Sequence, residues 1–335
     1  MIWMKWFNVV ERPEKLRTFN FFIGGRGIGK SYSMINHCAS DRGSGRRFLY
    51  LCNTREQIEN CATEAGNPFK KWNHNNNRDL RLASSANFAN IVDASRDNEV
   101  LGYSASASTF NNLRGIDGSD IDIIFWDEFI EPKDKRLAYQ QFDAFVNLYE
   151  TVNRNRELEN EQPVQVFFLS NARTAQNEVL AGFNLTDRIV TMIRSDQTTY
   201  SNNEVFLSLC KNEVSDAKRD TALYKTITGT KAYDENINNQ FSHDSMAGIK
   251  AHVNLREYIP LFGYDDLYCY KHKSRVEYYI CNSYSNNVPE FQSINGVTLW
   301  ARVWWQTMSD AVSRGIVFYS SFTTKMQFEK LLRWK

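Results

Sequence analysis

The residues best suited to chemistry lie near the start of the chain, in one continuous octet. Its residues are Gly24, Gly25, Arg26, Gly27, Ile28, Gly29, Lys30 and Ser31. The octet matches G-x-x-x-x-G-K-[ST], the phosphate-binding loop, in which glycines bring backbone N–H groups close to phosphate oxygens. Lys30 would neutralise the β- and γ-phosphates, and the Ser31 hydroxyl can bind Mg²⁺. We therefore predict that this loop binds a nucleoside triphosphate with Mg²⁺, rather than forming a glycine-rich turn without a ligand.

A second pair of candidate residues, Asp127 and Glu128, directly follows the apolar run Ile121–Trp126. An acid at the end of a buried strand can hold Mg²⁺, and the next acid can polarise the water that attacks the γ-phosphate. We therefore predict that Asp127 binds the metal and that Glu128 activates water for hydrolysis. The chain has no N-K-x-D guanine-recognition motif, which favours ATP over GTP.

Four arginines could stabilise the charge that develops during phosphoryl transfer. Arg154 and Arg156 follow a predicted amphipathic helix and could reach the nucleotide of a neighbouring subunit, although both could also lie on a solvated helix end. Arg26, inside the octet, could act within its own subunit, and Arg55 follows a predicted strand. An arginine in this role can raise the hydrolysis rate by about 10³–10⁵-fold.

Two other polar features follow predicted strands. Ser170-Asn171 ends a strand and resembles a γ-phosphate sensor, in which the amide of Asn171 would report hydrolysis; an ordinary turn is the alternative. Lys133, Lys135 and Arg136 follow the acid pair in a loop. These cations suit a loop that grips phosphates and moves with the hydrolysis state, and a solvated charge cluster is the alternative.

The elements that position these residues alternate between strands and helices. Strands are predicted at residues 18–23, 46–51, 121–126, 164–169 and 189–193, and helices at 30–39, 57–65 and 137–152. Residues 79–110 favour small strands or hairpins. This alternation predicts an α/β fold with a parallel sheet covered on both faces and a ligand at the carboxyl ends of the strands.

The character of the chain changes near residue 200. Residues 204–224 are charged and predict a helical connector, and residues 258–282 contain short strands separated by turns, followed by helices near 297–308 and 328–334. We therefore predict an ATPase domain at 1–203, a helical linker at 204–230 and a smaller α+β domain at 231–335. Lys271, His272, Lys273 and Arg275 form a basic hairpin tip that could touch nucleic acid, whereas the aromatic residues of this region are more typical of a core.

Composition restricts the classes of partner. The 335 residues carry a net charge of +1, so any contact with nucleic acid must be local rather than due to a global basic field. The six cysteines lack metal-ligand spacing, which favours free thiols in a reducing compartment. The apolar N-terminal run is short and interrupted by Lys5, so we expect a soluble intracellular protein without membrane contact.

Five segments together resemble the DNA-packaging ATPases of phi29-type bacteriophages. They are FFIGGRGIGKSYSM, IIFWDEFIEPKD, LYETVNRNRE, FFLSNA and GTKAYDENINNQFSHDS. They follow the family's order along most of the chain. The phosphate loop with its internal arginine and following Ser-Tyr, and the string Asp-Glu-Phe-Ile, are more specific than a general phosphate loop.

The resemblance implies a P-loop ASCE (RecA-like) ATPase domain with a mostly parallel sheet, a helical linker, and a C-terminal domain resembling a degenerate RNase H-like nuclease. It implies a homo-oligomeric ring, typically a pentamer, formed in the host cell cytoplasm. Such a ring docks on the portal, or connector, of an empty prohead and drives double-stranded DNA inward. By position, Arg154 falls on the trans-acting arginine finger, Arg55 on a second basic trans-acting residue, and Lys133 on the DNA-gripping loop.

Two departures limit what the resemblance implies. A two-metal nuclease needs an acid on its first core strand, and residues 258–262 contain none, whereas Asp265 and Asp266 lie in the following turn. We therefore expect no nuclease activity and a nucleic-acid or portal-binding role for this domain. Some relatives dock on a structural packaging RNA, and nothing in this sequence demonstrates that partner. The alternatives are another ring-forming DNA helicase or translocase, and a nucleotide-gated adaptor without motor activity.

Overall fold

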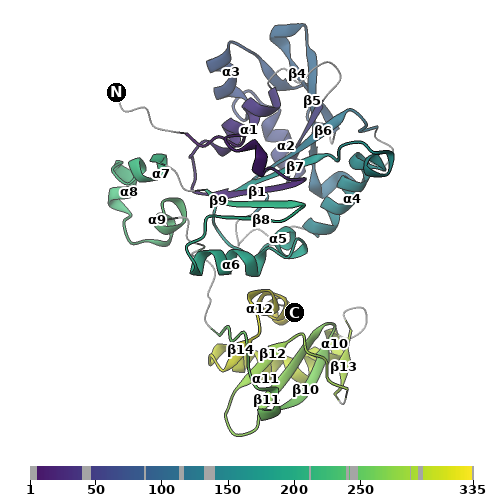
Figure 1. Cartoon of the computed structure of the whole chain (residues 1–335), viewed down its shortest axis with the longest axis vertical. Helices are drawn as coiled ribbons and strands as arrows, with labels where there is room; N and C mark the ends of the chain where they lie inside the picture. Colours follow the sequence, from purple (N-terminus) through teal and green to yellow (C-terminus); the bar gives the residue numbers. More distant parts are fainter. Residues whose placement is uncertain are drawn as a thin grey trace. The chain divides into compact units, whose positions relative to one another are not determined.

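Apolar runs separated by helices build a large mixed sheet in the first part of the chain (Figure 1). Among the described residues it has nine strands in the order β3-β4-β5-β2-β6-β7-β1-β9-β8. The bounds are β1 (Phe19–Gly24), β2 (Arg47–Cys52), β3 (Leu80–Leu82), β4 (Phe88–Asp93), β5 (Glu99–Ser106), β6 (Ile121–Asp127), β7 (Gln165–Ser170), β8 (Thr199–Ser201) and β9 (Val205–Cys210). The strands from β5 to β9 in this order pair in parallel, and antiparallel β3, β4 and β8 extend the two edges. The predicted α/β class is confirmed.

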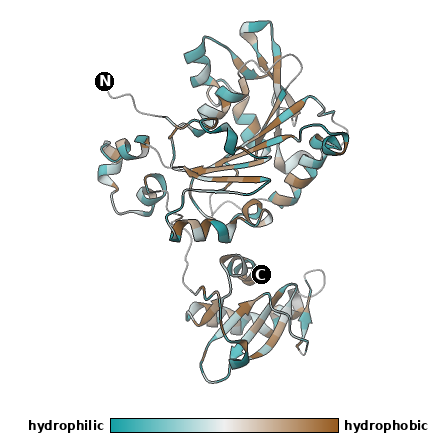
Figure 2. Cartoon of the chain, viewed as in Figure 1, coloured by the Kyte–Doolittle hydropathy of each residue, from teal (hydrophilic) through white to brown (hydrophobic). Residues whose placement is uncertain are grey.

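Helices cover both faces of this sheet because successive strand residues point to opposite sides. The helices described in this part of the chain are α1 (Lys30–Ala39), α2 (Arg55–Cys61), α3 (Lys70–Asn76), α4 (Gln141–Asn153), α5 (Glu178–Gly182), α6 (Thr186–Arg194), α7 (Glu213–Lys218), α8 (Ala222–Thr226) and α9 (Lys231–Asn236). Phe22 of β1 belongs to the core that α1 and α2 cover. The neighbouring Phe21 stacks on Phe168 of β7, which packs against Phe145 of α4. Figure 2 shows these central strands coloured mainly as hydrophobic.

The computed structural model describes residues 6–39, 47–86, 88–112, 117–131, 140–210, 213–238, 241, 248–286, 288–292 and 297–333. The chain divides into one unit of residues 1–182 with 192–243, and a second of 183–191 with 244–335. Short 3-10 turns occupy Pro13–Lys15, Ala94–Arg96, Ala107–Asn112, Arg156–Glu159 and Leu255–Glu257. Within the described ranges, no helix is long and apolar enough to cross a lipid bilayer.

Two local predictions are wrong. Val205–Cys210 forms β9, which pairs with β1, where the sequence suggested the beginning of a helical connector. Its apolar residues belong to the sheet, and the helical stretch begins only with α7. Residues 189–193 lie in the helix α6 instead of a final strand. Leu185, Ile189 and Met192 are all buried, a spacing of four and three residues that matches one helix face.

Among the residues described in it, the second unit contains a five-stranded sheet in the order β13-β10-β11-β12-β14. Its strands are β10 (Tyr258–Tyr264), β11 (Leu267–His272), β12 (Tyr278–Cys281), β13 (Glu290–Phe291) and β14 (Val317–Tyr319). Strands β10, β11 and β12 form an antiparallel meander, with β13 parallel to β10 and β14 parallel to β12. The helices α10 (Val297–Trp300), α11 (Gln306–Ser313) and α12 (Phe322–Leu332), with a π-helical turn at Ala301–Trp305, supply the rest of its core. The predicted meander and helical cover are therefore confirmed.

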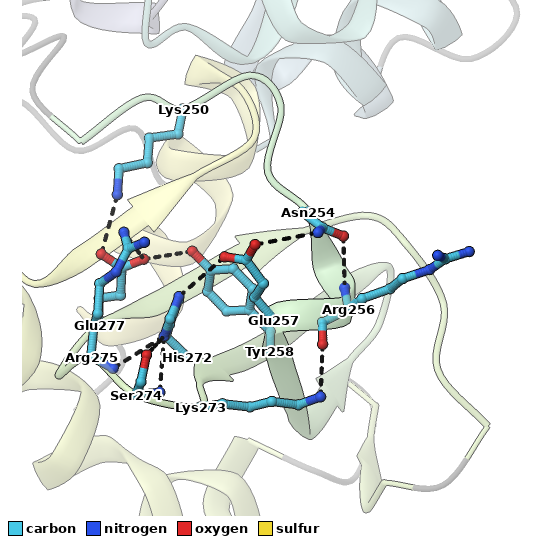
Figure 3. A network of polar contacts seen from close by, with 10 residues as sticks. All are labelled: Lys250, Asn254, Arg256, Glu257, Tyr258, His272, Lys273, Ser274, Arg275 and Glu277. Carbon is cyan, nitrogen blue, oxygen red and sulfur yellow. Dashed lines mark hydrogen bonds and ion pairs between the residues drawn. The ribbon is translucent and has the colours of Figure 1, made fainter.

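The turn between β11 and β12 is supported by a polar network (Figure 3). His272 Nδ1 accepts the backbone N–H groups of Ser274 and Arg275 at 3.0 and 3.1 Å. The buried carboxylate of Glu277 accepts from Tyr258 Oη at 2.6 Å and from Lys250 Nζ at 3.2 Å. Burial alone would raise the pKa of Glu277, but these hydrogen bonds and nearby positive charges outweigh it, so its pKa lies below the ordinary value. The predicted basic hairpin tip is thus followed closely by a buried acid, Glu277.

Candidate active site

The phosphate loop connects β1 to α1, and its backbone requires glycine at two positions. Gly27 and Gly29 have φ angles of +68° and +104°, which residues with side chains rarely adopt. The Nζ atom of Lys30, the first residue of α1, donates to the carbonyls of Gly24 at 2.9 Å and Gly25 at 2.8 Å. Burial lowers the pKa of Lys30, and nearby acidic groups partly oppose this shift. The ammonium group is therefore held at the loop by the loop's own backbone.

Asp127 ends β6 beside the phosphate loop. Burial raises the pKa of Asp127 to about 6; the hydroxyl of Ser31 and the charge of Lys30 lower it, and the charge of Glu128 raises it. The Ser31 hydroxyl lies close enough to the Asp127 carboxylate to lower its pKa, so two oxygen atoms that can bind a metal lie near each other. Mg²⁺ is bound in proteins by one or two oxygen side chains, with water and phosphate oxygens completing the shell. This donor set fits Mg²⁺.

Glu128 adopts a left-handed backbone conformation with φ +50°, which is uncommon for a residue with a side chain. Its N–H donates to Asp127 Oδ1 at 3.1 Å, and its carbonyl accepts from Asn53 Nδ2 at 2.8 Å. Asn53 is fully buried, and its Oδ1 accepts from Trp126 Nε1 at 2.9 Å and Gln141 Nε2 at 3.0 Å. A buried polar cluster thus fixes the backbone that carries the candidate catalytic glutamate.

The predicted residues from three strand ends meet at one cavity of about 790 Å³. Lys30, Ser31, Asp127, Glu128 and Asn171 all line it, together with most of the loop. Asn171 follows β7, and its Oδ1 lies 3.5 Å from Lys30 Nζ. The carboxyl ends of parallel strands meet at this edge of the sheet, as expected for an α/β fold. The cavity is large enough for a small-molecule ligand of nucleotide size.

The candidate arginines are placed differently from one another. Arg26 lines the cavity, whereas Arg55, Arg154 and Arg156 are not among the described residues that line it. Arg154 follows α4 with its side chain 54% exposed, 3.8 Å from Asp117. Arg156 is buried, and its Nη2 donates to the carbonyl of Ser119 at 2.8 Å.

The remaining predicted site residues are Arg55 and the cations of the loop after β6. Arg55 begins α2, and its exposed side chain pairs with Glu59 at 2.9 Å. The predicted DNA contacts Lys133, Lys135 and Arg136 lie outside the described residues.

Some residues of the site were not predicted from the sequence. Lys218, at the end of α7, donates through Nζ to the carbonyl of Arg26 in the phosphate loop. No sequence pattern signals this contact, because the two residues are 192 positions apart. Asn53 directly follows β2, and its position at a strand end is the signal that could have identified it. Trp6 and Lys71 also line the cavity.

The chain is similar to known proteins along most of its length. The family model described as Podovirus DNA encapsidation protein (Gp16) matches residues 4–280. The DNA packaging protein of Bacillus phage phi29 is 27% identical over 249 residues, covering 71% of this chain and 68% of that protein. The DNA packaging protein of Bacillus phage PZA is 28% identical over 244 residues, covering 70% and 66% respectively. The match thus spans about two thirds of the length of these relatives.

Solved structures show a similar fold over nearly the whole chain. The bacteriophage Phi-29 viral genome packaging motor assembly contains a chain with a TM-score of 0.65 and 17% identity, covering 98% of this chain and 99% of that one. The Phi-28 gp11 DNA packaging motor has the same TM-score and identity, with 98% of each chain covered. At this level of identity, the similarity concerns the fold alone.

Proposed function

We propose that this chain, which belongs to the Podovirus DNA encapsidation protein (Gp16) family, is the ATP-hydrolysing subunit of a motor that moves double-stranded viral DNA into a preformed prohead. The observation that carries this proposal is the meeting of Lys30, Ser31, Asp127 and Glu128 at one cavity. These residue types supply charge neutralisation, metal binding and activation of water, which phosphoryl transfer to water requires. The names of the similar proteins supply the substrate class, viral DNA.

The predicted residues at the cavity have distinct roles in this mechanism. Backbone N–H groups of the loop and the ammonium of Lys30 bind the β- and γ-phosphates. Bound to the oxygens of Ser31 and Asp127, Mg²⁺ would neutralise charge that develops on the phosphates. Glu128 accepts a hydrogen bond from the attacking water and orients it toward the γ-phosphate. Asn171, in contact with Lys30, reports the presence of the γ-phosphate to β7.

The site is completed by a neighbouring subunit in a homo-oligomeric ring, for which we propose five members. Arg154 is the proposed trans-acting arginine, because it is exposed and does not line the cavity of its own subunit. Burial of Arg156 and its bond to Ser119 suit a role in supporting this helix end instead. Arg55 is exposed and is the proposed second trans-acting cation, while Arg26 acts within its own cavity.

The remaining partners follow from the same proposal. Lys133, Lys135 and Arg136 are the proposed DNA contacts, and the ring acts at the portal vertex of the prohead after assembly in the host cytoplasm. A packaging RNA is a further proposed partner. The antiparallel meander with β13 parallel to β10 supports an RNase H-like origin for the second unit. Since β10 contains no acidic residue, we propose that this unit docks rather than cleaves nucleic acid.

The test is a comparison of Glu128→Gln with Lys30→Ala in ATP binding, ATP hydrolysis and DNA packaging into proheads. Glu128→Gln is expected to retain ATP and to lose both hydrolysis and packaging, since only the water-activating carboxylate is removed. Lys30→Ala is expected to lose ATP binding. Nearly normal hydrolysis by Glu128→Gln would refute the assigned mechanism, and packaging that continues without hydrolysis would refute the motor.

A further inference from the structure

One cation that the proposed mechanism does not use lies against the backbone of the phosphate loop. Lys218, the last residue of α7, donates through Nζ to the carbonyl of Arg26. The ammonium group lies so close to the loop that a Cβ added to Gly27 would be 2.7 Å from Nζ. Arg26 and Gly27 line the cavity, whereas Lys218 is not among the described residues that line it. Lys218 thus contacts the loop backbone without lining the cavity.

This contact fixes the direction of one peptide group in the loop. A trans peptide unit is planar, so its N–H points opposite to its C=O. Because the Arg26 carbonyl is directed at Lys218, the N–H of Gly27 points away from that ammonium group. Backbone N–H groups in such a loop are the donors that bind phosphate oxygens. The contact therefore holds the Gly27 N–H in a position to donate into the cavity that Gly27 lines.

The same contact brings three positive charges together at the loop. Burial lowers the pKa of Lys218, and the charge of Arg26 lowers it as well. The charge of Lys218 in turn contributes to the lowered pKa of Lys30. Like charges at this spacing repel one another, and a polyphosphate bound at the loop would relieve the repulsion. Lys218 therefore favours an anion at the loop by its charge as well as by the peptide that it orients.

Lys218 reaches the loop from a group of short helices, α7, α8 and α9, which we call the α7–α9 segment (Figure 1). Arg219 directly follows α7, and its Nη2 donates to Oδ1 of Asn238, beyond the end of α9, at 3.1 Å. The ring centres of Tyr224 in α8 and Tyr233 in α9 lie 6.2 Å apart. These contacts hold the three helices together, and Lys218 attaches them to the phosphate loop.

We propose that Lys218 is a positioning residue for phosphate binding, supplied to the loop by the α7–α9 segment. In this proposal, which rests on the proposed ATPase function, its hydrogen bond to the Arg26 carbonyl holds the Gly27 N–H toward the phosphates. Since Lys218 is outside the described cavity lining, it acts on the affinity for phosphates rather than on the chemical step.

The test compares Lys218→Met with Arg219→Ala in the full-length chain, with ATP and inorganic tripolyphosphate as ligands. Methionine keeps an unbranched side chain and removes the ammonium group, and Lys218 is only half-buried, so this change should leave folding intact. Arg219→Ala removes a neighbouring positive charge that bonds to Asp216 and Asn238. Tripolyphosphate carries the phosphates without a nucleoside, so it reports on the loop.

Lys218→Met is expected to weaken ATP and tripolyphosphate binding alike, by about tenfold, the lower end of what a hydrogen bond from a charged group contributes. In steady-state hydrolysis its KM for ATP is expected to rise by a similar factor, while kcat stays within about twofold of wild type, because ground state and transition state use the loop equally. Arg219→Ala is expected to bind both ligands like wild type.

Unchanged affinity for both ligands in Lys218→Met would overturn the proposal. Equal weakening by Lys218→Met and Arg219→Ala would overturn it too, since Lys218 would then act through the fold of the α7–α9 segment. Weakening of ATP alone would exclude a role at the phosphates. A wild-type chain that binds neither ATP nor tripolyphosphate would instead refute the proposed ATPase function, so the two failures are distinguishable.

Discussion

Replacing Asn53 by aspartate removes the Nδ2 group, which donates a hydrogen bond to the Glu128 carbonyl. The substitution keeps the Oδ1 atom, which accepts hydrogen bonds from Trp126 and Gln141. The Nδ2 of Asn53 donates to the Glu128 carbonyl and also to Glu131 Oε1 at 2.7 Å. An oxygen at this position would face both of these acceptors. Losing one buried hydrogen bond costs about 1–3 kcal/mol, and more where a charged group is left unpaired. We therefore expect the free energy of unfolding to fall by roughly 2–4 kcal/mol.

The effect on catalysis follows from the backbone of Glu128. Its left-handed conformation costs about 1–2 kcal/mol, which is close to what one hydrogen bond to its carbonyl contributes. Without that bond, the Glu128 backbone can relax toward an extended conformation, which moves its carboxylate away from the attacking water. We expect kcat for ATP hydrolysis to fall at least about tenfold, because a general base acts only within hydrogen-bond reach of its water, while KM changes little.

The assay is steady-state ATP hydrolysis alongside chemical denaturation, with Asn177→Asp as the matched control. Asn177 Nδ2 donates to Gln141 Oε1 at 2.8 Å, one step further along the same buried network. Its Oδ1 accepts from the backbone N–H groups of Val179 and Leu180, within its own helix turn. The control should lose stability but keep kcat. The reasoning is refuted if Asn53→Asp loses stability like the control and keeps its kcat.

Three further predictions address the ring, the second unit and the sheet. Arg154→Ala should hydrolyse ATP slowly alone, but mixing it with Glu128→Gln should restore ATP hydrolysis, because the Glu128→Gln subunit supplies Arg154 to a neighbour that retains Glu128. No gain in hydrolysis on mixing would exclude a trans role for Arg154. The pKa of Glu277 is lower in the folded chain than its ordinary value of 4.5. The ionised carboxylate therefore stabilises the fold above pH 4.5, and this stabilisation is lost as the pH falls through the pKa of the folded chain. Acid titration of unfolding should be flatter below pH 4.5 in Glu277→Gln, and an unchanged profile would contradict this. Gly24→Ala would place a Cβ 2.5 Å from the Cys210 carbonyl oxygen. The free energy of unfolding, measured by thermal unfolding, should therefore fall by about 1–3 kcal/mol. Wild-type stability in this variant would contradict the tight pairing of β1 with β9.

The sequence predicted the parts of the site that are encoded locally. The phosphate loop, its following helix and the acid pair after β6 are continuous segments, so residue type and spacing were enough to place them. The buried Asn53 cluster could not be predicted this way, because Asn53 and Glu128 are 75 positions apart and meet only when β2 and β6 pair.

The errors in the fold have similar physical causes. Strand β9 directly precedes a long charged stretch, so its apolar run was assigned to the connector, whereas its pairing with β1 places it in the sheet. Helix α6 contains β-branched residues that favour a strand by propensity, while burial of one helix face decides otherwise. In α6, therefore, tertiary contacts outweighed local preference.

The most direct test of the account is the ATPase rate per subunit of the full-length chain, measured over a range of concentrations with and without double-stranded DNA. A motor whose active site is completed by Arg154 of a neighbour should hydrolyse ATP faster as rings assemble, and DNA should increase the rate further. A dilute monomer as active as the concentrated protein, with no response to DNA, would contradict the account.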